Sequence, residues 1–239
     1  MKNIDAPSEI LPKQRAVEAF REGMERYKSP STMSSYIDDW FRNKEKTCEK
    51  GTLNALAHVV IETDDSLWMI ALKNALRVAG TSAELDSNVA DKLIDEGFES
   101  DVAFHLRAFR NLGPETVMKL TEKGGMLSIL HHEKSFREIP RQFFEQVIRE
   151  DHGISLMTAV WRGDFSWKFM DQIEFLNAFL NHGKEQYGHQ VVVSMRAFDE
   201  SRHDEVARIL IRTGYAEDVK RYIESFKNLT DETRQMLLT

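Results

Sequence analysis

Two segments of this 239-residue chain repeat each other, and the repeat constrains the fold more than any other feature. Residues 89–120 and residues 206–237 align over thirty-two positions without a gap, and thirteen of these positions are identical. Others are conservative, such as Phe98 with Tyr215 and Leu106 with Ile223. A match of this length in one register indicates a repeated structural unit, and internal repeats are typical of modular helical proteins. The repeat therefore predicts an architecture, although it predicts no chemistry.

Each copy of the repeat predicts three helices. In the second copy, the first helix is expected to end at Gly214, because glycine commonly follows the last helical residue. The next helix is predicted from an apolar stripe with helical spacing, made of Val219, Tyr222, Ile223, Phe226 and Leu229. The first copy has the same stripe, made of Val102, His105, Leu106, Phe109 and Leu112. Thr230 is expected to cap a third, short helix with acidic residues in its first turn.

The rest of the chain also predicts short amphipathic helices. Strand signals are almost absent, since the one β-branched run, residues 191–193, lies in a helix-compatible pattern without a hairpin partner. Pro12, Pro114 and Pro140 stand where helices are expected to begin. Seven glycines have the spacing of residues that end helices, namely Gly80, Gly97, Gly124, Gly153, Gly163, Gly183 and Gly214. Residues 28–35 form the best candidate for a loop.

The expected fold is all-α. Short stacked helices are expected to form either an α-solenoid-like array or a closed orthogonal helical-repeat array, because one helix pair of this size cannot bury its apolar face alone. Weaker echoes of the repeat, such as Phe136 and Phe175 at positions that match Phe109, favour repeated units along much of the chain. No linker-like stretch interrupts the pattern. Residues 1–239 are therefore predicted to form a single helical domain, with residues 1–50 as a candidate N-terminal helical subregion.

Charge and hydropathy narrow the classes of partner. The net charge is −7, and no block of Lys and Arg is present to neutralise nucleic-acid phosphates. Residues 51–113 carry five Lys/Arg against ten Asp/Glu, and such an acidic stretch favours a basic partner. No apolar run is long enough to span a bilayer, and no signal-peptide pattern is visible. We therefore expect a soluble, cytoplasmic protein, with signal-independent export as the alternative.

No local motif predicts catalysis, a metal site or a cofactor. The single cysteine, Cys48, has no second cysteine for a disulfide or a zinc pair. Glu200 and His203 have the spacing of di-iron ligands, but no second ExxH motif completes such a site. The His203-Asp204 pair occurs in metal-dependent phosphohydrolases, yet here it fits the polar start of a helix. Phosphate-binding glycine loops, a nucleophile elbow and an HExxH motif are absent.

One aromatic cluster is the only sequence hint of a binding site. Trp161, Phe165, Trp167 and Phe169 fall within nine residues across a predicted turn. Most such rings belong to a core, but rings at helix junctions can also line a groove, and tryptophan is a frequent binding anchor. We take Trp161, Phe165 and Trp167 as candidate binding residues.

The function that this architecture favours is a scaffold that binds a protein or peptide partner along the repeat surface. Two alternatives stay open at this point. One is an enzyme whose site is assembled from dispersed His, Asp and Glu residues, and the other is a helical repeat that binds nucleic acid. Architecture alone is a weak argument for function, so the choice depends on the site.

Overall fold

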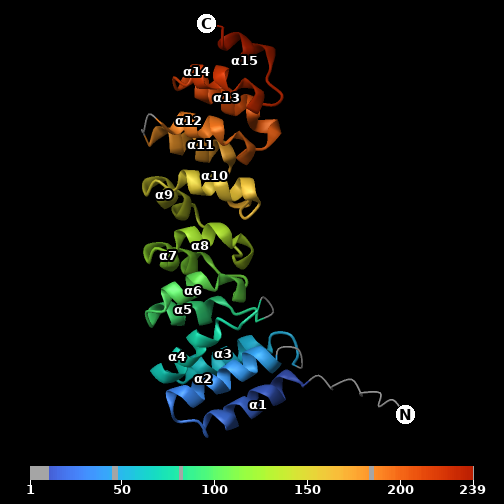
Figure 1. Cartoon of the computed structure of the whole chain (residues 1–239), viewed down its shortest axis with the longest axis vertical. Coiled ribbons are helices and arrows are strands. Elements are labelled where there is room, and N and C mark those ends of the chain that lie inside the picture. The colour runs from blue at the N-terminus through green and yellow to red at the C-terminus, as the bar shows by residue number, and fades with distance from the viewer. Residues whose placement is uncertain (1–10, 45–47, 81–82, 183–185, 239) are drawn as a thin grey trace, which may run out of the picture. The chain divides into compact units, whose positions relative to one another are not determined.

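The computed structural model describes residues 11–44, 48–80, 83–182 and 186–238. These residues form fifteen α-helices and no strand, which confirms the predicted all-α class. The chain divides into two compact units, an N-terminal unit of residues 1–138 and a C-terminal unit of residues 139–239 (Figure 1). That all repeated units stack into one array stays a prediction.

The N-terminal unit contains eight α-helices in its described part. They are α1 (Lys13–Met24), α2 (Pro30–Asp39), α3 (Thr52–Glu62), α4 (Ser66–Ala75), α5 (Ser87–Asp95), α6 (Glu99–Phe104), α7 (Pro114–Glu122) and α8 (Met126–His131). A π-helical turn, Trp40–Lys44, extends α2. Within this unit α2 packs against α4, α1 against α3, and α5 against α7 (Figure 1).

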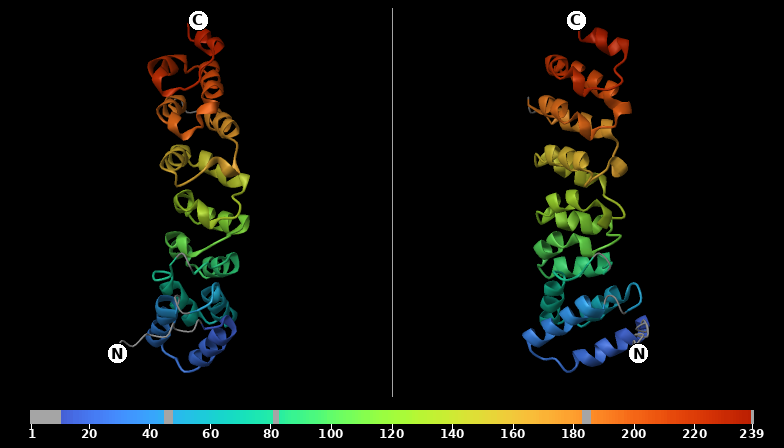
Figure 2. Two further views of the ribbon diagram at one scale, coloured as in Figure 1. Left: turned by 90° about the vertical axis from the view of Figure 1, so that its right-hand side faces the viewer. Right: turned by 45° about the vertical axis from the view of Figure 1, so that its right-hand side comes forward.

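The C-terminal unit contains seven α-helices in its described part. They are α9 (Arg141–Arg149), α10 (Gly153–Arg162), α11 (Gln172–Asn181), α12 (Tyr187–Val193), α13 (His203–Arg212), α14 (Ala216–Arg221) and α15 (Asp231–Met236). Consecutive helix pairs are neighbours within this unit, since α11 packs against both α9 and α13 (Figure 2). In the described residues of the whole chain, no helix is long and apolar enough to cross a membrane.

Short 3-10 turns interrupt the helices that the apolar stripes predicted. α6 ends at Phe104 and α14 ends at Arg221, so the prediction of one continuous helix as far as Leu112 or Leu229 is wrong. A 3-10 turn follows each helix instead. The 3-10 turns are η2 (Leu106–Ala108), η3 (Glu133–Ser135), η4 (Trp167–Phe169), η5 (Met195–Ala197), η6 (Glu200–Arg202) and η7 (Ile223–Ser225).

Backbone pairing with an earlier segment explains why the chain leaves the helix after η2. Phe109 has extended backbone angles and forms an isolated parallel bridge with Leu85. The Leu85 N–H donates to the carbonyl of Ala108 at 2.9 Å, and the Arg110 N–H donates to the carbonyl of Leu85 at 2.8 Å. These bonds satisfy backbone groups that a continued helix would have paired internally. Phe109 is nevertheless fully buried, so the apolar pattern was read correctly and only its helical geometry was wrong.

The two repeated segments have the same local structure. α6 and α14 have identical lengths 117 positions apart, and so do the turns η2 and η7. Gly97 and Gly214 follow the first helix of each segment with φ of 86° and 97°, as the sequence predicted. Asn111 and Asn228 also have positive φ, 55° and 56°, a conformation that asparagine tolerates better than most residues.

One hydrogen bond recurs at equivalent positions although its residues differ. In the first segment, the backbone N–H of Gly113 donates to the hydroxyl of Ser87 at 2.8 Å. In the second, the backbone N–H of Thr230 donates to a carboxylate oxygen of Asp204 at 2.7 Å. Each bond joins the first turn of one helix, α5 or α13, to the residue that precedes the third helix of the same segment, α7 or α15. Thr230 also caps α15, as predicted, because its hydroxyl accepts from the N–H of Thr233.

A second recurring contact holds an aspartate with an amide side chain. The amide of Asn54 accepts from the backbone N–H of Asp86 at 3.0 Å and donates to its carboxylate at 2.9 Å. Nε2 of His58 lies 2.7 Å from the same carboxylate oxygen. In the C-terminal unit, Gln172 contacts the backbone N–H and the carboxylate of Asp199 in the same way. Each pair joins neighbouring helical layers by two bonds.

Residues 28–35 do not form the predicted loop, because α2 begins at Pro30. Ser29 and Thr32 form a capping box, in which each side chain bonds to the other residue's backbone N–H. Proline at the first helical position adds to this start signal. The polar composition of the segment is thus that of a helix N-terminus.

The prediction that glycines end helices is confirmed at Gly97, Gly124, Gly163 and Gly214 and is wrong at Gly153. Gly80 lies five residues after the end of α4, and Gly183 lies outside the described residues. Gly124 and Gly163 have positive φ after α7 and α10, like the two glycines of the repeat. Gly153 does not end a helix but begins α10. A Cβ at Gly153 would lie 2.4 Å from the ring of Phe179, so glycine is needed there for close packing. The left-handed position that ends the preceding helix is taken by Asp151, with φ of 67°.

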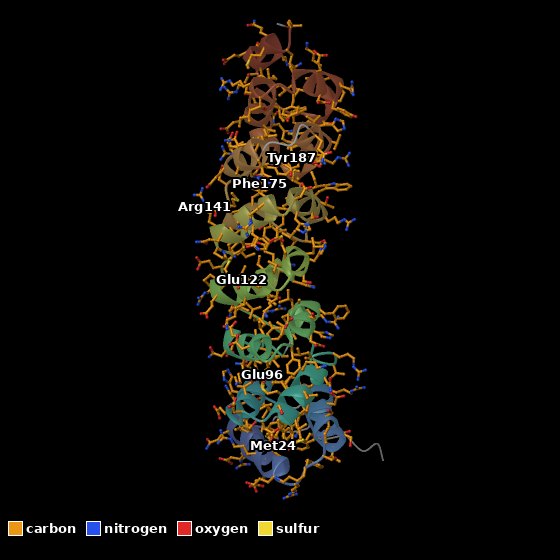
Figure 3. The ribbon with its side chains drawn as sticks, turned by 90° about the vertical axis from the view of Figure 1, so that its left-hand side faces the viewer. Met24, Glu96, Glu122, Arg141, Phe175 and Tyr187 are labelled. Atoms are coloured by element: carbon orange, nitrogen blue, oxygen red, sulfur yellow. The ribbon has the colours of Figure 1, made fainter. Side chains whose placement is uncertain are left out.

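Stacked aromatic rings fill the middle of the C-terminal unit. Phe175 stacks on Phe179 with ring centroids 5.6 Å apart, and Phe179 stacks on Tyr187 at 4.1 Å. All three side chains are fully buried, and Figure 3 labels two of them, Phe175 and Tyr187. The Tyr187 hydroxyl donates to the carboxylate of Asp151, which satisfies the one polar group of this stack.

Replacement of Phe109 with alanine should destabilise the protein strongly, because its side chain is fully buried. A loss of about 3–5 kcal/mol in the free energy of unfolding is expected for a buried phenylalanine. Phe104→Ala provides a matched control, since Phe104 is 77% exposed. Urea unfolding followed by circular dichroism measures both. Equal losses for the two variants would contradict the burial assigned to Phe109.

The carboxylate of Asp86 should stabilise the fold in a pH-dependent way. Partial burial tends to raise its pKa, but hydrogen bonds from Asn54, His58 and the backbone of Val89 outweigh burial and lower it below the ordinary value of 3.8. Ionised Asp86 is therefore favoured in the folded state, and this contribution is lost as the pH falls through the folded-state pKa. Between about pH 5 and pH 2, the stability difference between the wild-type protein and Asp86→Asn should shrink as the pH falls below about 4. Urea titrations across this range test it, and a difference that does not change with pH would disprove the lowered pKa.

Candidate binding groove

The histidine singled out by the sequence, His203, has a structural role. It is buried at the start of α13, and both of its ring nitrogens contact the backbone. Nδ1 accepts from the backbone N–H of Lys227 at 2.9 Å, and Nε2 lies 3.2 Å from the carbonyl of Phe198. Because a backbone N–H can only donate, Nε2 carries the ring proton. Neither nitrogen then has a free lone pair for a metal. Among the described residues, no group of three or more His, Cys, Asp and Glu could hold a metal ion.

A groove of about 740 Å³ in the C-terminal unit is the most distinctive surface feature near the predicted binding residues. Residues of α10, the end of α12, and the turns η5, η6 and η7 line it. Two apolar side chains stand exposed at this groove, Trp161 at 57% and Val193 at 54%. Large apolar side chains that share an open groove often mark a binding site.

The floor of the groove is apolar and its rim is charged. Met157, Met195 and Phe198 form part of the lining, and each is buried. The charged lining residues carry both signs, namely Arg196, Glu200, Glu224 and Lys227. A buried apolar floor with a polar rim is the anatomy of a protein-binding surface.

The geometry of α10 explains why Trp161 is exposed. Leu156, Met157 and Ala159 form part of its buried face. Trp161 follows Met157 by four residues and therefore lies on the same side, one turn closer to the helix end. α10 ends at Arg162, and the exposed residues Trp161, Arg162 and Gly163 stand at this end of the helix. Its indole ring thus continues the apolar floor that Met157 begins.

Phe165 and Trp167, the other two candidate residues, line a second hollow of about 600 Å³. Phe165 is buried, with its ring edge-on to Phe144 at 6.1 Å. Trp167 is half-buried against Phe198, and its Nε1–H donates to the carbonyl of Ala197 at 2.6 Å. These contacts give both side chains a packing role.

Arg196 and Phe198 line both hollows, so the two lie next to each other in the C-terminal unit. Neither residue, nor Val193, was among the candidate binding residues predicted from the sequence. Val193 belongs to a β-branched run that fitted a helix, and nothing local distinguished its exposed position from the buried positions of Val191 and Val192.

The acidic stretch 51–113 is largely neutralised within the fold. Its ion pairs are Glu62–Arg21, Asp64–Lys92, Glu84–Lys50, Asp95–Lys119, Glu96–Lys92 and Asp101–Lys73. Asp65 and Asp86 cap α4 and α5. Eight of the ten carboxylates therefore have a cation or a helix N-terminus as partner, and the stretch adds little to the argument for a basic partner.

No protein-family model, curated protein or solved structure matches this chain.

Replacement of Trp161 or Trp167 with alanine should change the free energy of unfolding by different amounts. Trp161→Ala should change the free energy of unfolding by no more than about 0.5 kcal/mol, as is usual for exposed positions. Trp167→Ala removes packing on Phe198 and a hydrogen bond, so a loss of about 3 kcal/mol is expected. Chemical unfolding of both variants gives the comparison. A large loss for Trp161→Ala would mean that this ring belongs to the core.

Proposed function

We propose that this protein is a helical-repeat scaffold that binds a protein or peptide partner, and that the groove beside Trp161 takes up a short segment of that partner. One observation carries the proposal. Trp161 and Val193 are both more than half exposed at a groove whose floor is apolar and buried. Exposed apolar area of this kind gains free energy when a partner covers it.

The lining of the groove favours a peptide segment with a bulky apolar side chain. Such a side chain would lie between Trp161 and Val193, above the buried Met157 and Met195. Tryptophan is enriched among residues that dominate binding energy, and a groove that excludes water around it increases that effect. The rim offers Arg196 and Lys227 as well as two glutamates, so charged residues of either sign can flank the apolar side chain. The sequence-based expectation of a basic partner has no further support from this rim.

The recurring contacts of the fold favour a scaffold rather than an isolated site. The bonds Gly113–Ser87 and Thr230–Asp204 recur at equivalent positions of the repeat. Repeat proteins commonly present binding surfaces over several neighbouring units, and the groove is lined by parts of three successive helix pairs. We keep the expectation of a cytoplasmic location as part of this proposal.

A displayed library of random twelve-residue peptides, selected on the full-length protein, tests the groove. Enriched peptides should share a bulky apolar residue. Binding of a selected peptide, measured by fluorescence anisotropy, should weaken about tenfold or more in Trp161→Ala and in Val193→Ala. Leu127→Ala serves as a control, because Leu127 is 46% exposed on α8 of the N-terminal unit and lies outside the groove.

Two results would overturn the proposal. One is a library that yields no enriched peptide. The other is a set of peptides whose affinity is the same for the wild-type protein, Trp161→Ala and Val193→Ala. Circular dichroism of each variant establishes that it is folded before its binding is compared.

A further inference from the structure

The 3-10 turns that follow the helix pairs carry a cation at their central position. Arg107 in η2, Lys134 in η3, Lys168 in η4 and Arg196 in η5 all occupy it, and all four are exposed. η7 has Glu224 at this position, and η6, which leads directly into α13, has Ser201. The pattern cannot be seen from sequence spacing, because the turns are defined only once the helices before them have ended.

In the N-terminal unit, two of these turns are joined side by side. η2 and η3 contact each other, and the Ser135 hydroxyl of η3 donates to the carbonyl of Leu106 in η2 at 2.7 Å. The helices that precede the turns, α6 and α8, are also in contact (Figure 1). Arg107 and Lys134 therefore stand on adjacent, fixed turns.

Further cations extend this row. Arg110 and Arg137 each lie three residues after the central cation of their turn, on extended segments held by backbone bonds to Leu85 and Leu112. Arg77 also lies nearby. Burial lowers the pKa of His105, and both Arg107 and Arg77 are close enough to lower it further. We call Arg77, Arg107, Arg110, Lys134 and Arg137 the basic edge.

Most of the basic edge has no internal counter-charge. Among the described residues, Arg107, Arg110, Lys134 and Arg137 form no ion pair, and Arg77 reaches Asp38 only at 4.0 Å. Lysines elsewhere in the same unit are paired, for example Lys92 and Lys119. The carboxylates near this edge are Glu133 on η3, Glu138 after it, and Asp101, which also acts on His105 and pairs with Lys73. They are fewer than the cations. Acidic side chains of the N-terminal unit thus pair with lysines such as Lys92 and Lys119, and the basic edge keeps a net positive charge.

An exposed aromatic ring stands beside the basic edge. Phe104 is 77% exposed, and its ring lies edge-on to that of His105 at 4.9 Å. Phe104 occupies the same place before η2 that Val193 occupies before η5. An apolar contact is therefore available next to the row of cations.

We propose that the basic edge binds an acidic peptide segment, whose carboxylates pair with Arg107, Lys134 and their neighbours while an apolar residue covers Phe104. Arginine can bind a carboxylate through two parallel hydrogen bonds, so the pair has a defined geometry in addition to its electrostatic attraction. Complementary charge on a partner also speeds its association.

An acidic polypeptide fits this edge better than a nucleic acid. Single-stranded nucleic acids are bound by grooves with a series of aromatic platforms along the backbone track. The basic edge has one exposed phenylalanine, and Glu133 and Glu138 interrupt its positive charge. A peptide with alternating charged and apolar residues can avoid these carboxylates. This proposal is independent of the groove in the C-terminal unit.

The test uses the full-length protein and a fluorescein-labelled peptide built from four Glu-Glu-Leu repeats. The charge-reversed variant Arg107→Glu/Lys134→Glu should bind it about tenfold more weakly than the wild-type protein. The control Lys28→Glu/Arg149→Glu reverses one lysine and one arginine that are also exposed and form no ion pair in the described residues. It changes the net charge equally, and its affinity should stay within about twofold of wild type at physiological salt.

Two further probes fix the class of partner. The same peptide with glutamine in place of glutamate should bind weakly, and so should labelled oligothymidine of equal length. Equal weakening by both double variants, or no binding of the acidic peptide to the wild-type protein, would overturn the proposal. Tighter binding of oligothymidine through Arg107 and Lys134 would also overturn it and assign the edge to nucleic acid. Trp161→Ala should bind the acidic peptide normally, which separates this result from that for the groove.

Discussion

The structure depends on how its short helices end. A helix leaves up to four N–H groups and four carbonyls without internal partners, and α6, α8, α14 and α15 have six residues each. A residue with left-handed backbone angles after a helix allows some of these carbonyls to accept hydrogen bonds. At Gly97 and Gly214 it lets the next N–H bond to a carbonyl five residues back, at 2.9 Å in both cases. Side-chain caps and bonds between neighbouring layers satisfy further groups.

The same constraint decides where binding chemistry is available. A 3-10 turn follows each helix pair from α5–α6 to α13–α14 and presents its central side chain to solvent. In the C-terminal unit this position holds Arg196, at the rim of the groove. In the N-terminal unit it holds Arg107 and Lys134 on two adjacent turns. One structural device can therefore present different surfaces, because its central residue is free of packing constraints.

The candidate site was partly predictable from the sequence. Trp161 was selected because aromatic residues cluster around a turn, and it lines the groove. Phe165 and Trp167 were selected for the same reason, but both are packed against other rings. The cluster could not separate these cases, because exposure depends on which helices from other parts of the chain cover each ring. Val193 carried no local signal for the same reason.

The sequence by itself determined the helical class and many of the helix ends. Pro114 and Thr230 start helices, and Gly97 and Gly214 end them, because these signals act within one turn of the backbone. Tertiary structure alone decided that the chain turns extended at Phe109, because the partner strand segment lies more than twenty residues earlier at Leu85. It also decided which acids are neutralised and which cations stay open. Such pairings join residues that are far apart in the sequence and meet only when the helices pack. Local sequence patterns therefore do not predict them.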